Sequence, residues 1–401
     1  MGKKTKKPQI RFAGFTDDWE QRKLGEVGSV SMCRRIFKEQ TSESGDIPFY
    51  KIGTFGGQAD AYISSELFAE YRSKYPYPKE GDILISASGS IGRTVEFTGK
   101  NEYYQDSNIV WLSHDDRLDN AFLKCFYSVV KWAGIEGSTI KRLYNDNILN
   151  TVICMPSVDE QRKIGTFLKE LDHLITLHQR KLSKLKNIKK SMLEKMFPQN
   201  SEMRPEIRFA GFTDDWEQRK LGELSERTFG GGTPNTSNNE YWNGDIPWFQ
   251  SSDIPDGNLF GVAPKKFISQ EGLSKSAAQL IPENSIAIIT RVGVGKLAFV
   301  PFPYTTSQDF LSLSKLKTEP FFTVYACYKK LQSELNAVQG TSIKGITKDE
   351  LLAKQIMVPN YAEQYQIGAF FTNLDNLITL HQRKLEKLGK IKKAMLEKMF
   401  V

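Results

Sequence analysis

The stretch EQRKIGTFLKELDHLITLHQRKLSKLKNIKKSMLEKMF, residues 160–197, returns as EQYQIGAFFTNLDNLITLHQRKLEKLGKIKKAMLEKMF at residues 363–400. In both copies apolar residues alternate three and four positions apart, which is the a/d pattern of a coiled-coil helix. A helix of about 38 residues is roughly 55 to 60 Å long. The repeat therefore predicts two long helices that bury their apolar stripes on one another. The stripes comprise Leu168, Leu171, Ile175, His178, Leu182, Leu185, Lys189, Met192 and Met196, and Phe371, Leu374, Ile378, His381, Leu385, Leu388, Lys392, Met395 and Met399.

A second repeat stands far upstream of each helix. RFAGFTDDWEQRKLGE occurs unchanged at residues 11–26 and 208–223, and we call it the lead-in segment. Pro156 and Pro359 precede the two helices, and Pro198 ends the first. Each half therefore runs from a lead-in segment through a variable region to a long helix. Because the halves are repeats, an internal pseudo-twofold would make the helix pair antiparallel and place the variable regions at opposite ends of a spacer.

The variable regions share an outline although most side chains differ. GDILISASGSIGR (81–93) matches NSIAIITRVGVGK (284–296), YYQD (103–106) matches TSQD (306–309), and GSTIK (137–141) matches GTSIK (340–344). Runs rich in β-forming residues flank glycine-bearing turns at 83–86 and 94–97, and again at 286–290 and 297–300, which predicts two hairpins. An amphipathic helix is predicted from the apolar positions Phe122, Phe126, Val130 and Ala133, matched by Tyr325 and Leu331.

These patterns predict an α/β protein with two similar mixed α/β domains, a long antiparallel two-helix coiled coil and internal pseudo-twofold symmetry. The predicted segments are a basic tail with the first lead-in segment (1–26), a first domain (27–156), a first long helix (157–197), a linker with the second lead-in segment (198–223), a second domain (224–359) and a second long helix (360–401).

The composition is that of an ordinary globular chain of several domains. It has 401 residues, of which 39% are hydrophobic and 25% charged, so a disordered or fibrous protein is excluded. No apolar run approaches the roughly 18 residues that span a bilayer, and no secretion signal is visible. The cysteines Cys33, Cys125, Cys154 and Cys327 lie far apart, so neither a disulfide framework nor a structural zinc site is expected. This usage is typical of a reducing cytoplasm.

The net charge of +8 suggests a polyanionic partner, but it is unevenly distributed. The two helix stretches carry +5 and +3, and the lysines of residues 3–7 add +4, so the rest of the chain is slightly acidic at −4. Contact with nucleic acid would therefore depend on locally placed basic residues, helped by another subunit.

Motifs for catalysis and for cofactor binding are absent from the sequence. It contains no GxxxxGK[ST] loop, no GxGxxG after a strand, no Asn-Pro-Pro-Tyr tetrapeptide and no Asp/Glu-x-Lys. The histidines His114, His173, His178 and His381 lack metal-ligand spacing. We interpret His178 and His381 as residues of the helix seam, with a metal or pH switch as the less common alternative. No catalytic residue, bound cofactor or metal is expected in this chain.

The sequence resembles the specificity subunit of type I restriction-modification systems over its whole length. GGGTPNTSNNEYWNGDIPWFQSSDI (230–254) is similar to the G-G-T-P…Y-W-x-G-x-I-P-W motif of that family. The first half keeps GDIPFYKIG (45–53) and has MCRRIF (32–37) where GGGTP would stand. The resemblance implies a cytoplasmic, non-catalytic subunit whose two target-recognition domains each read one part of a split double-stranded DNA sequence. It also implies two modification subunits that use S-adenosylmethionine and two restriction subunits that use ATP and Mg²⁺.

Candidate DNA-contacting residues fall at equivalent places in the two halves. Lys141 and Lys344 each follow a matching Gly-containing turn and suit phosphate contacts, although a helix C-cap with a solvated lysine is an equal alternative. Arg93 and Lys296 keep a basic residue at the end of the hairpin turn. Ser88 and Arg291 occupy one equivalent position but differ, as expected for base readout, and an arginine can fork onto guanine. An ordinary surface arginine is the alternative there.

Two further sets of candidates come from the repeats. In the second half Gly232, Thr233, Asn235 and Trp248 are candidates for a loop facing a DNA groove, with Trp242 and Trp248 as core residues in the alternative interpretation. On the helices ITLHQRKL occurs at both 175–182 and 378–385, so Arg180 and Arg383 are candidate partner-binding residues. Maintenance of the helix seam is the alternative explanation of this repeat.

Two other functions remain open from the sequence alone. A stand-alone enzyme acting on DNA is disfavoured by the missing motifs. A coiled-coil scaffold that binds only protein is favoured by the slightly acidic balance outside the helices.

Overall fold

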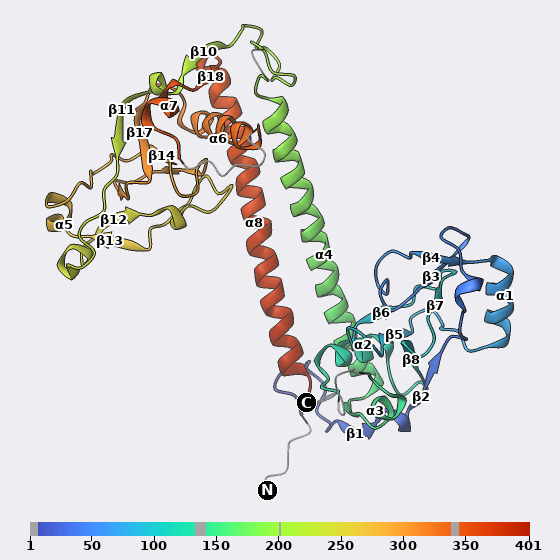
Figure 1. Ribbon diagram of the computed structural model, residues 1–401. Coiled ribbons are helices and arrows are strands. Elements are labelled where there is room, and N and C mark those ends of the chain that lie inside the picture. Colours follow the sequence, from blue (N-terminus) through green and yellow to red (C-terminus); the bar gives the residue numbers. More distant parts are fainter. Residues whose placement is uncertain (1–6, 133–141, 200–201, 338–344) are drawn as a thin grey trace. The chain divides into compact units, whose positions relative to one another are not determined.

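The computed structural model describes residues 7–132, 142–199, 202–337 and 345–401, and the chain divides into two compact units (Figure 1). Unit 1 comprises Met1–Gln179 with Arg383–Val401, and unit 2 comprises Arg180–Gln382. The long helices α4 (Val158–Lys195) and α8 (Tyr361–Met399) are each divided between the units. Each unit therefore contains one globular region and one part of each long helix.

Unit 1 is built on a four-stranded and a three-stranded sheet. The four-stranded sheet is antiparallel in the order β2-β8-β5-β6, and the other has the order β4-β3-β7 with β3 and β7 parallel. Strands β1 and β9 form an antiparallel pair that closes the region. The elements are β1 (Glu20–Lys23), β2 (Gly28–Met32), β3 (Ile47–Tyr50), β4 (Ala61–Ile63), α1 (Ser65–Lys74), β5 (Ile83–Ser86), β6 (Thr94–Glu96), β7 (Tyr103–Tyr104), β8 (Ile109–His114), α2 (Asn120–Val129), α3 (Asn145–Leu149) and β9 (Val152–Met155).

Unit 2 repeats this topology strand for strand. Its sheets have the orders β11-β17-β14-β15 and β13-β12-β16, and β10 pairs with β18. The elements are β10 (Glu217–Lys220), β11 (Ser225–Gly230), β12 (Ile246–Phe249), β13 (Lys266–Ile268), α5 (Gln270–Ser274), β14 (Ser285–Ile289), β15 (Leu297–Val300), β16 (Thr305–Thr306), β17 (Phe310–Leu316), α6 (Pro320–Ala337), α7 (Lys348–Ala353) and β18 (Gln355–Val358). The predicted pair of similar mixed α/β regions is confirmed.

Both predicted hairpins are present. Strand β5 pairs with β6 and strand β14 with β15, all antiparallel. Their turns need residues in the left-handed backbone region, which Gly92 and Gly295 supply with φ of 85° and 88°. The glycines that suggested these turns in the sequence are thus required by their geometry.

The predicted amphipathic helices form, with one correction to their length. Asp119 caps α2 by accepting a hydrogen bond from the Phe122 backbone N–H at 3.0 Å. The helix then ends at Val129, and Val130, expected inside it, has an extended backbone instead. Val130 still packs against the core of unit 1, so packing rather than helical periodicity explains its apolar character. Ala133 lies outside the described residues.

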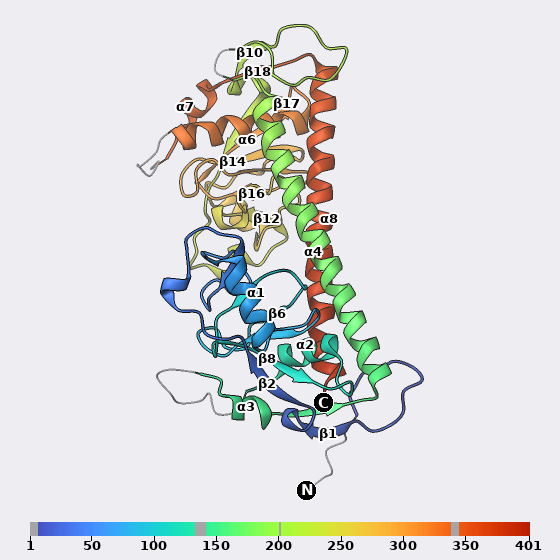
Figure 2. The same cartoon turned by 90° about the vertical axis from the view of Figure 1, so that its right-hand side faces the viewer.

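The long helices lie side by side within each unit in both views (Figures 1 and 2). In unit 1 the Lys392 ammonium of α8 donates to Asp172 of α4, and in unit 2 Lys189 of α4 donates to Asp375 of α8. In each unit the end of one helix therefore meets the beginning of the other. The predicted antiparallel pairing is confirmed in both units, and the lysines of the predicted seam make cross-helix ion pairs.

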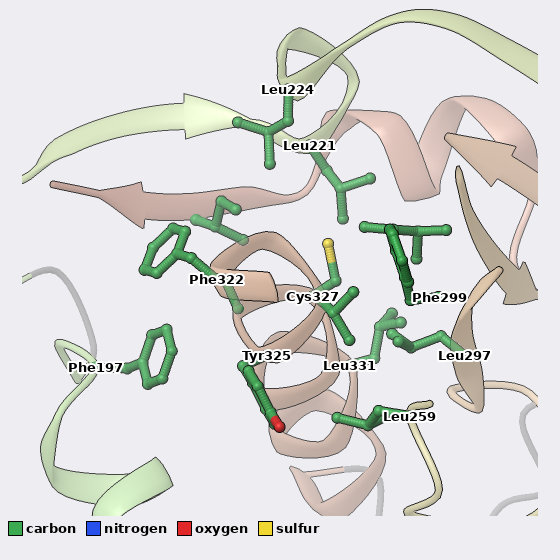
Figure 3. Packing of buried hydrophobic residues seen from close by; sticks show 14 of the residues in the cluster. Phe197, Leu221, Leu224, Leu259, Leu297, Phe299, Phe322, Tyr325, Cys327 and Leu331 are labelled. Atoms are coloured by element: carbon green, nitrogen blue, oxygen red, sulfur yellow. The ribbon is translucent and has the colours of Figure 1, made fainter. Parts of the chain in front are cut away.

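The end of each long helix packs into a core formed largely by the other half of the chain. In unit 2, Phe197 from the end of α4 stacks on Phe322 of α6, with ring centroids 5.7 Å apart (Figure 3). In unit 1, Phe400 after the end of α8 stacks on Phe122 of α2 at 5.2 Å. The same aromatic contact thus anchors both helix ends, which explains why both repeats finish in Lys-Met-Phe.

The lead-in segments hold these helix ends in place. Arg11 makes a two-pronged ion pair with Glu160 at 2.6 and 2.7 Å, and the Ile10 N–H donates to the Lys398 carbonyl at 3.0 Å. In unit 2, Arg208 pairs with Glu363, and the Ile207 N–H donates to the Lys195 carbonyl. The hydrogen bond from Arg11 to Glu160 raises the pKa of the arginine. Each lead-in segment, together with the isoleucine just before it, therefore joins the start of one long helix to the end of the other.

Candidate DNA-contacting loops

A short turn before β8 connects several loops of unit 1. Residues 105–108, which we call the first hub turn, lie between β7 and β8. Side chains or backbone of this turn bond to the segment after β2, the loop after β3, the hairpin turn after β5 and the chain at Arg142. The bonds are Arg35 Nε to Asp106 Oδ2 (2.7 Å), Ile52 N to Gln105 Oε1 (2.8 Å), Ser88 Oγ to Asn108 Oδ1 (2.8 Å) and Arg142 Nη2 to Ser107 O (3.1 Å).

Unit 2 has a corresponding second hub turn at residues 307–309, before β17. Gln308 Oε1 accepts a hydrogen bond from Thr233 Oγ at 2.6 Å, after the end of β11. The Asp309 carbonyl accepts from the Thr290 backbone N–H at 2.7 Å, at the start of the β14–β15 turn. Ser251 Oγ lies 3.3 Å from Asp309 Oδ2. Three of the four segments that meet at the first hub turn have counterparts at this one, with different side chains.

In unit 1 the predicted residues Ser88 and Arg93 both have structural contacts. Ser88 is half-buried and bonded to Asn108, so it belongs to the first hub turn's contacts. Arg93 Nη1 donates to the Phe55 carbonyl at 2.6 Å and ties the hairpin to the loop after β3, while the residue as a whole is exposed. Their DNA contacts stay a prediction.

In unit 2 the predicted residues Thr233 and Arg291 come close to the second hub turn. Thr233 donates a hydrogen bond to Gln308 of the second hub turn. Arg291 directly follows Thr290, whose backbone N–H donates to the Asp309 carbonyl of the same turn. Arg291 is exposed, and no described residue forms an ion pair with it. Lys296 stands half-buried at the far end of the hairpin turn. These positions suit contact with an external polyanion, and they too stay predictions.

The tryptophans beside the predicted loop support it from within. Trp248 is buried and donates its Nε1–H to the Gly232 carbonyl at 3.0 Å. Trp242 meets the Trp248 ring edge-on at 4.9 Å and donates to the Asn235 carbonyl. A Cβ at Gly232 would lie 2.2 Å from Ala277, so only glycine fits. The alternative interpretation of these tryptophans as core residues is confirmed for Trp248.

Asn235 is exposed, and its Oδ1 accepts from the Ser237 N–H at 3.0 Å, which stabilises the loop's own turn. The other predicted phosphate-contacting residues, Lys141 and Lys344, lie outside the described residues. Nothing structural bears on their role.

On the helices, the predicted partner-binding residues Arg180 and Arg383 are both exposed. Arg180 borders a shallow surface hollow of about 540 Å³ along α4, lined also by Ile188 and Met192. Sequence analysis missed apolar residues close to these arginines. Four leucines at repeated positions are 38% to 46% exposed: Leu174 and Leu177 on α4, and Leu377 and Leu380 on α8. Their spacing of three, outside the predicted seam, was the available signal.

Sequence analysis also missed a pair of arginines at the first hub turn. Arg34 and Arg35 belong to MCRRIF, which stands where the family motif would have GGGTP. Burial raises the pKa of the neighbouring Cys33 thiol to about 12, so this cysteine stays protonated. The signal was the presence of two adjacent arginines where the other half has glycine and threonine.

A family model described as the type I restriction modification DNA specificity domain matches residues 16–187 and 213–390. The chain belongs to this family. Each match contains one variable region and most of the long helix that follows it. The sequence-based assignment to this family is thus confirmed, and with it a role in DNA specificity rather than in catalysis.

Relatives agree with this assignment. A type I restriction enzyme specificity subunit of Haemophilus influenzae is 59% identical over 152 residues, which is 38% of this chain and 40% of that protein. A type I restriction enzyme specificity subunit of Methanocaldococcus jannaschii is 26% identical over 95% of this chain and 92% of its own. The crystal structure of a type I restriction-modification system S subunit from M. genitalium has a TM-score of 0.64 at 15% identity, covering 98% of this chain and 99% of that one.

The described residues contain neither a cluster of metal ligands nor a helix that could cross a membrane. In the described parts of the chain, no three His, Cys, Asp or Glu side chains gather as they would around a metal ion. None of the described helices is both long enough and apolar enough to cross a membrane.

Proposed function

We propose that this chain reads a bipartite double-stranded DNA target, one half-site with each globular region. The observation that carries the proposal is the pair of hub turns. Two regions of identical strand order present different side chains around an equivalent turn: the exposed Arg35 and the half-buried Ser88 in one, and the exposed Thr233 and Arg291 in the other. A shared scaffold with different side chains at base-edge distance is what two unlike half-sites need.

The proposal assigns all chemistry to other subunits. Two modification subunits would bring S-adenosylmethionine, and two restriction subunits would bring ATP and Mg²⁺, while this chain binds no cofactor. The missing nucleotide-binding and methyltransferase motifs support this division. The complex would act on DNA in the cytoplasm.

The long helices supply a suitable surface for the modification subunits. Leu174 and Leu177 on α4 lie close in sequence to Arg180, and Leu377 and Leu380 on α8 lie equally close to Arg383. Exposed leucines beside a cation are typical of a protein interface. Because the set occurs once on each helix, two equal surfaces would seat two equal partners.

Methylation mapping tests the recognition role. The full chain is purified with the modification subunit of the same system, and methylated sequences in a random DNA library are determined. We expect a split sequence with two specified parts. The chain alone is expected neither to methylate nor to cut DNA and to bind it weakly, because its globular regions are slightly acidic. Cutting by the purified chain with Mg²⁺, or turnover with S-adenosylmethionine, would refute the proposal.

Native mass spectrometry tests the partner surface. Arg180→Glu together with Arg383→Glu should weaken assembly with the modification subunits, because reversed charges sit beside the exposed leucines. Circular dichroism of the variant should be unchanged, since both side chains are exposed. Lys100→Glu, a charge reversal at another exposed residue in the first globular region, is the control. Unchanged stoichiometry in the double variant would count against this surface.

A further inference from the structure

Strand register shows which residues of the two regions occupy the same place. Met32 of β2 faces Val110 of β8, and Gly230 of β11 faces Leu311 of β17. In turn Ile85 of β5 faces the same Val110, and Ile288 of β14 faces the same Leu311. Met32 and Gly230 therefore occupy equivalent positions. Two residues after them, Arg34 corresponds to Gly232, and three residues after them, Arg35 corresponds to Thr233.

Hydrogen bonds to the backbone support this equivalence. The Tyr103 hydroxyl donates to the Arg34 carbonyl at 3.1 Å, and Trp248 Nε1 donates to the Gly232 carbonyl at 3.0 Å. Both carbonyls are thus held by a buried aromatic side chain from the three-stranded sheet. These aromatic residues come from different strands, β7 and β12, but in both regions the backbone carbonyl at this place is anchored while the side chains there differ.

At this shared place one region has a charged pair and the other a neutral pair. Arg35 Nε donates to Asp106 Oδ2 at 2.7 Å, whereas Thr233 Oγ donates to Gln308 Oε1 at 2.6 Å. The Arg35 side chain is 60% exposed while that of Asp106 is 16% exposed, so the carboxylate anchors an arginine that projects outward. Asp106 is itself held in place within the first hub turn, because the carbonyl of its neighbour Ser107 accepts a hydrogen bond from Arg142.

The geometry of this pair leaves the end of the guanidinium available. Asp106 engages Nε, and no described residue accepts a hydrogen bond from Arg35 Nη1 or Nη2. Those two nitrogens form the fork that matches O6 and N7 of guanine in the major groove. A guanidinium already held by a carboxylate loses less conformational freedom when it binds. Lysine has no such fork and does not replace arginine at a bidentate contact.

Building on the proposed DNA-reading function, we infer that Arg35, oriented by Asp106, reads a guanine in the half-site of the first region. Its neighbour Arg34 has a different role. The Arg34 guanidinium lies 5.2 Å from the centre of the Tyr75 ring, and among the described residues it has no carboxylate partner. Arg34, Arg35 and Tyr75 line a surface pocket of about 440 Å³ that also contains Asp106. Arg34 contacts a backbone phosphate, which positions the duplex without reading it.

The test uses the full chain with the modification subunit of the same system. Arg35→Ala should lower the preference for guanine at one position of the first half-site by about 5- to 150-fold, the range for losing one bidentate contact. Base preferences in the second half-site should be the same as in the complex with the unsubstituted chain. Arg35→Lys should restore only part of the preference. Because Arg35 is exposed, none of these variants should unfold the chain.

The positioning role of Asp106 needs its own variants. Asp106→Ala should lower the guanine preference at the same position less than Arg35→Ala does. Asp106→Asn should keep most of that preference, because the amide oxygen can still accept a hydrogen bond from Arg35 Nε. Arg34→Ala is the matched control. It should leave base preferences unchanged, weaken binding evenly and reduce the slope of log affinity against log salt concentration by about one.

Three outcomes decide the matter. An Arg35→Ala complex with unchanged preferences in the first half-site would overturn the role of Arg35 and leave the proposed function intact. Relaxation confined to the second half-site would overturn the assignment of this region to its half-site. If the complex with the unsubstituted chain methylates no split sequence, the proposed function itself is refuted.

Discussion

At the scale of single residues, a buried ion pair explains an unchanged repeat. The Glu160 side chain is fully buried, and the Arg11 side chain is 14% exposed. A buried carboxylate is tolerated only when it is paired, so the arginine of RFAGF cannot change alone. The second copy repeats the arrangement with Arg208 and Glu363, whose side chains are equally buried. The lead-in sequence is therefore constrained by structure in both halves.

Arg11→Ala should lower the free energy of unfolding by about 3 kcal/mol, because it leaves the Glu160 carboxylate buried without a partner. Urea unfolding followed by circular dichroism measures the change. Lys7→Ala, which removes the exposed pair of Lys7 with Asp18, should have no measurable effect. Adding Glu160→Gln to Arg11→Ala should recover part of the loss, since a neutral amide is less costly to bury. Equal effects of Arg11→Ala and Lys7→Ala would contradict this account.

A second residue-scale prediction concerns the second half-site. Arg291→Ala should relax one base position there by about 1 to 3 kcal/mol if the arginine makes a bidentate contact. Methylation mapping of the variant complex provides the measurement. Arg219→Ala is the control, because Arg219 is engaged with Glu217 on β10, away from the second hub turn. Changes in both half-sites from Arg291→Ala would argue against independent reading by the two regions.

At the scale of elements, the paired helices owe their register to charges within an apolar seam. Lys189 and Asp375 are 13% and 21% exposed, and the Tyr325 hydroxyl donates to the same carboxylate at 2.7 Å. The equivalent pair Lys392 and Asp172 is 30% and 47% exposed. A shift of either helix by one turn would leave a lysine in the seam without its aspartate. A polar residue in a coiled-coil seam commonly fixes register in this way.

The two ion pairs should differ in strength because their exposure differs. A double-mutant cycle on Lys189 and Asp375 should give a coupling energy of about 1 to 2 kcal/mol. The same cycle on Lys392 and Asp172 should give less than about 1 kcal/mol, because water screens that pair. Chemical unfolding of the four variants in each cycle measures both values. A larger coupling for the more exposed pair would mean that burial does not set their strength.

At the scale of the whole molecule, each helix end is held by equivalent contacts. The stacking of Phe400 on Phe122 matches that of Phe197 on Phe322, and the Ile10 bond to Lys398 matches that of Ile207 to Lys195. In a chain cut near Pro205, Phe197 would be free to stack on Phe122 of a second copy. The first half therefore contains every residue type that a symmetric pair of half-chains needs.

A chain ending near Pro205 should consequently form a dimer. Lys189 of each copy would pair with Asp172 of the other, as Lys189 pairs with Asp375 and Lys392 with Asp172 in the intact chain. With the modification subunit, the dimer should methylate an inverted repeat of the first half-site. Sedimentation and methylation mapping test the two parts. Phe197→Ala in the half-chain should weaken the dimer, and a half-chain that stays monomeric would contradict the prediction.

The sequence by itself determined the elements that depend on local pattern and on repetition. A seam alternating three and four residues apart specifies a long helix whatever surrounds it, and α4 and α8 follow the predicted helices closely. Glycines that must adopt positive φ marked both hairpin turns in advance. Exact repetition of the lead-in block and close repetition of the helix block fixed the two-region organisation, because similar sequences in similar surroundings adopt the same structure.

Only the tertiary structure decided which side chains meet. The pairing of Arg35 with Asp106 joins residues 71 positions apart, and no local periodicity encodes such a contact. Val130 was predicted to lie in a helix, but its backbone is extended. Its apolar side chain packs against the core of unit 1, so its hydrophobicity reflects packing rather than helical periodicity. Arg93 turned out to bond a backbone carbonyl, although its charge alone suggested an external partner. Sequence periodicity predicts the structure of one helix or strand. A recognition surface is formed by loops from several elements, and the contacts between those loops depend on how all the elements beneath them pack.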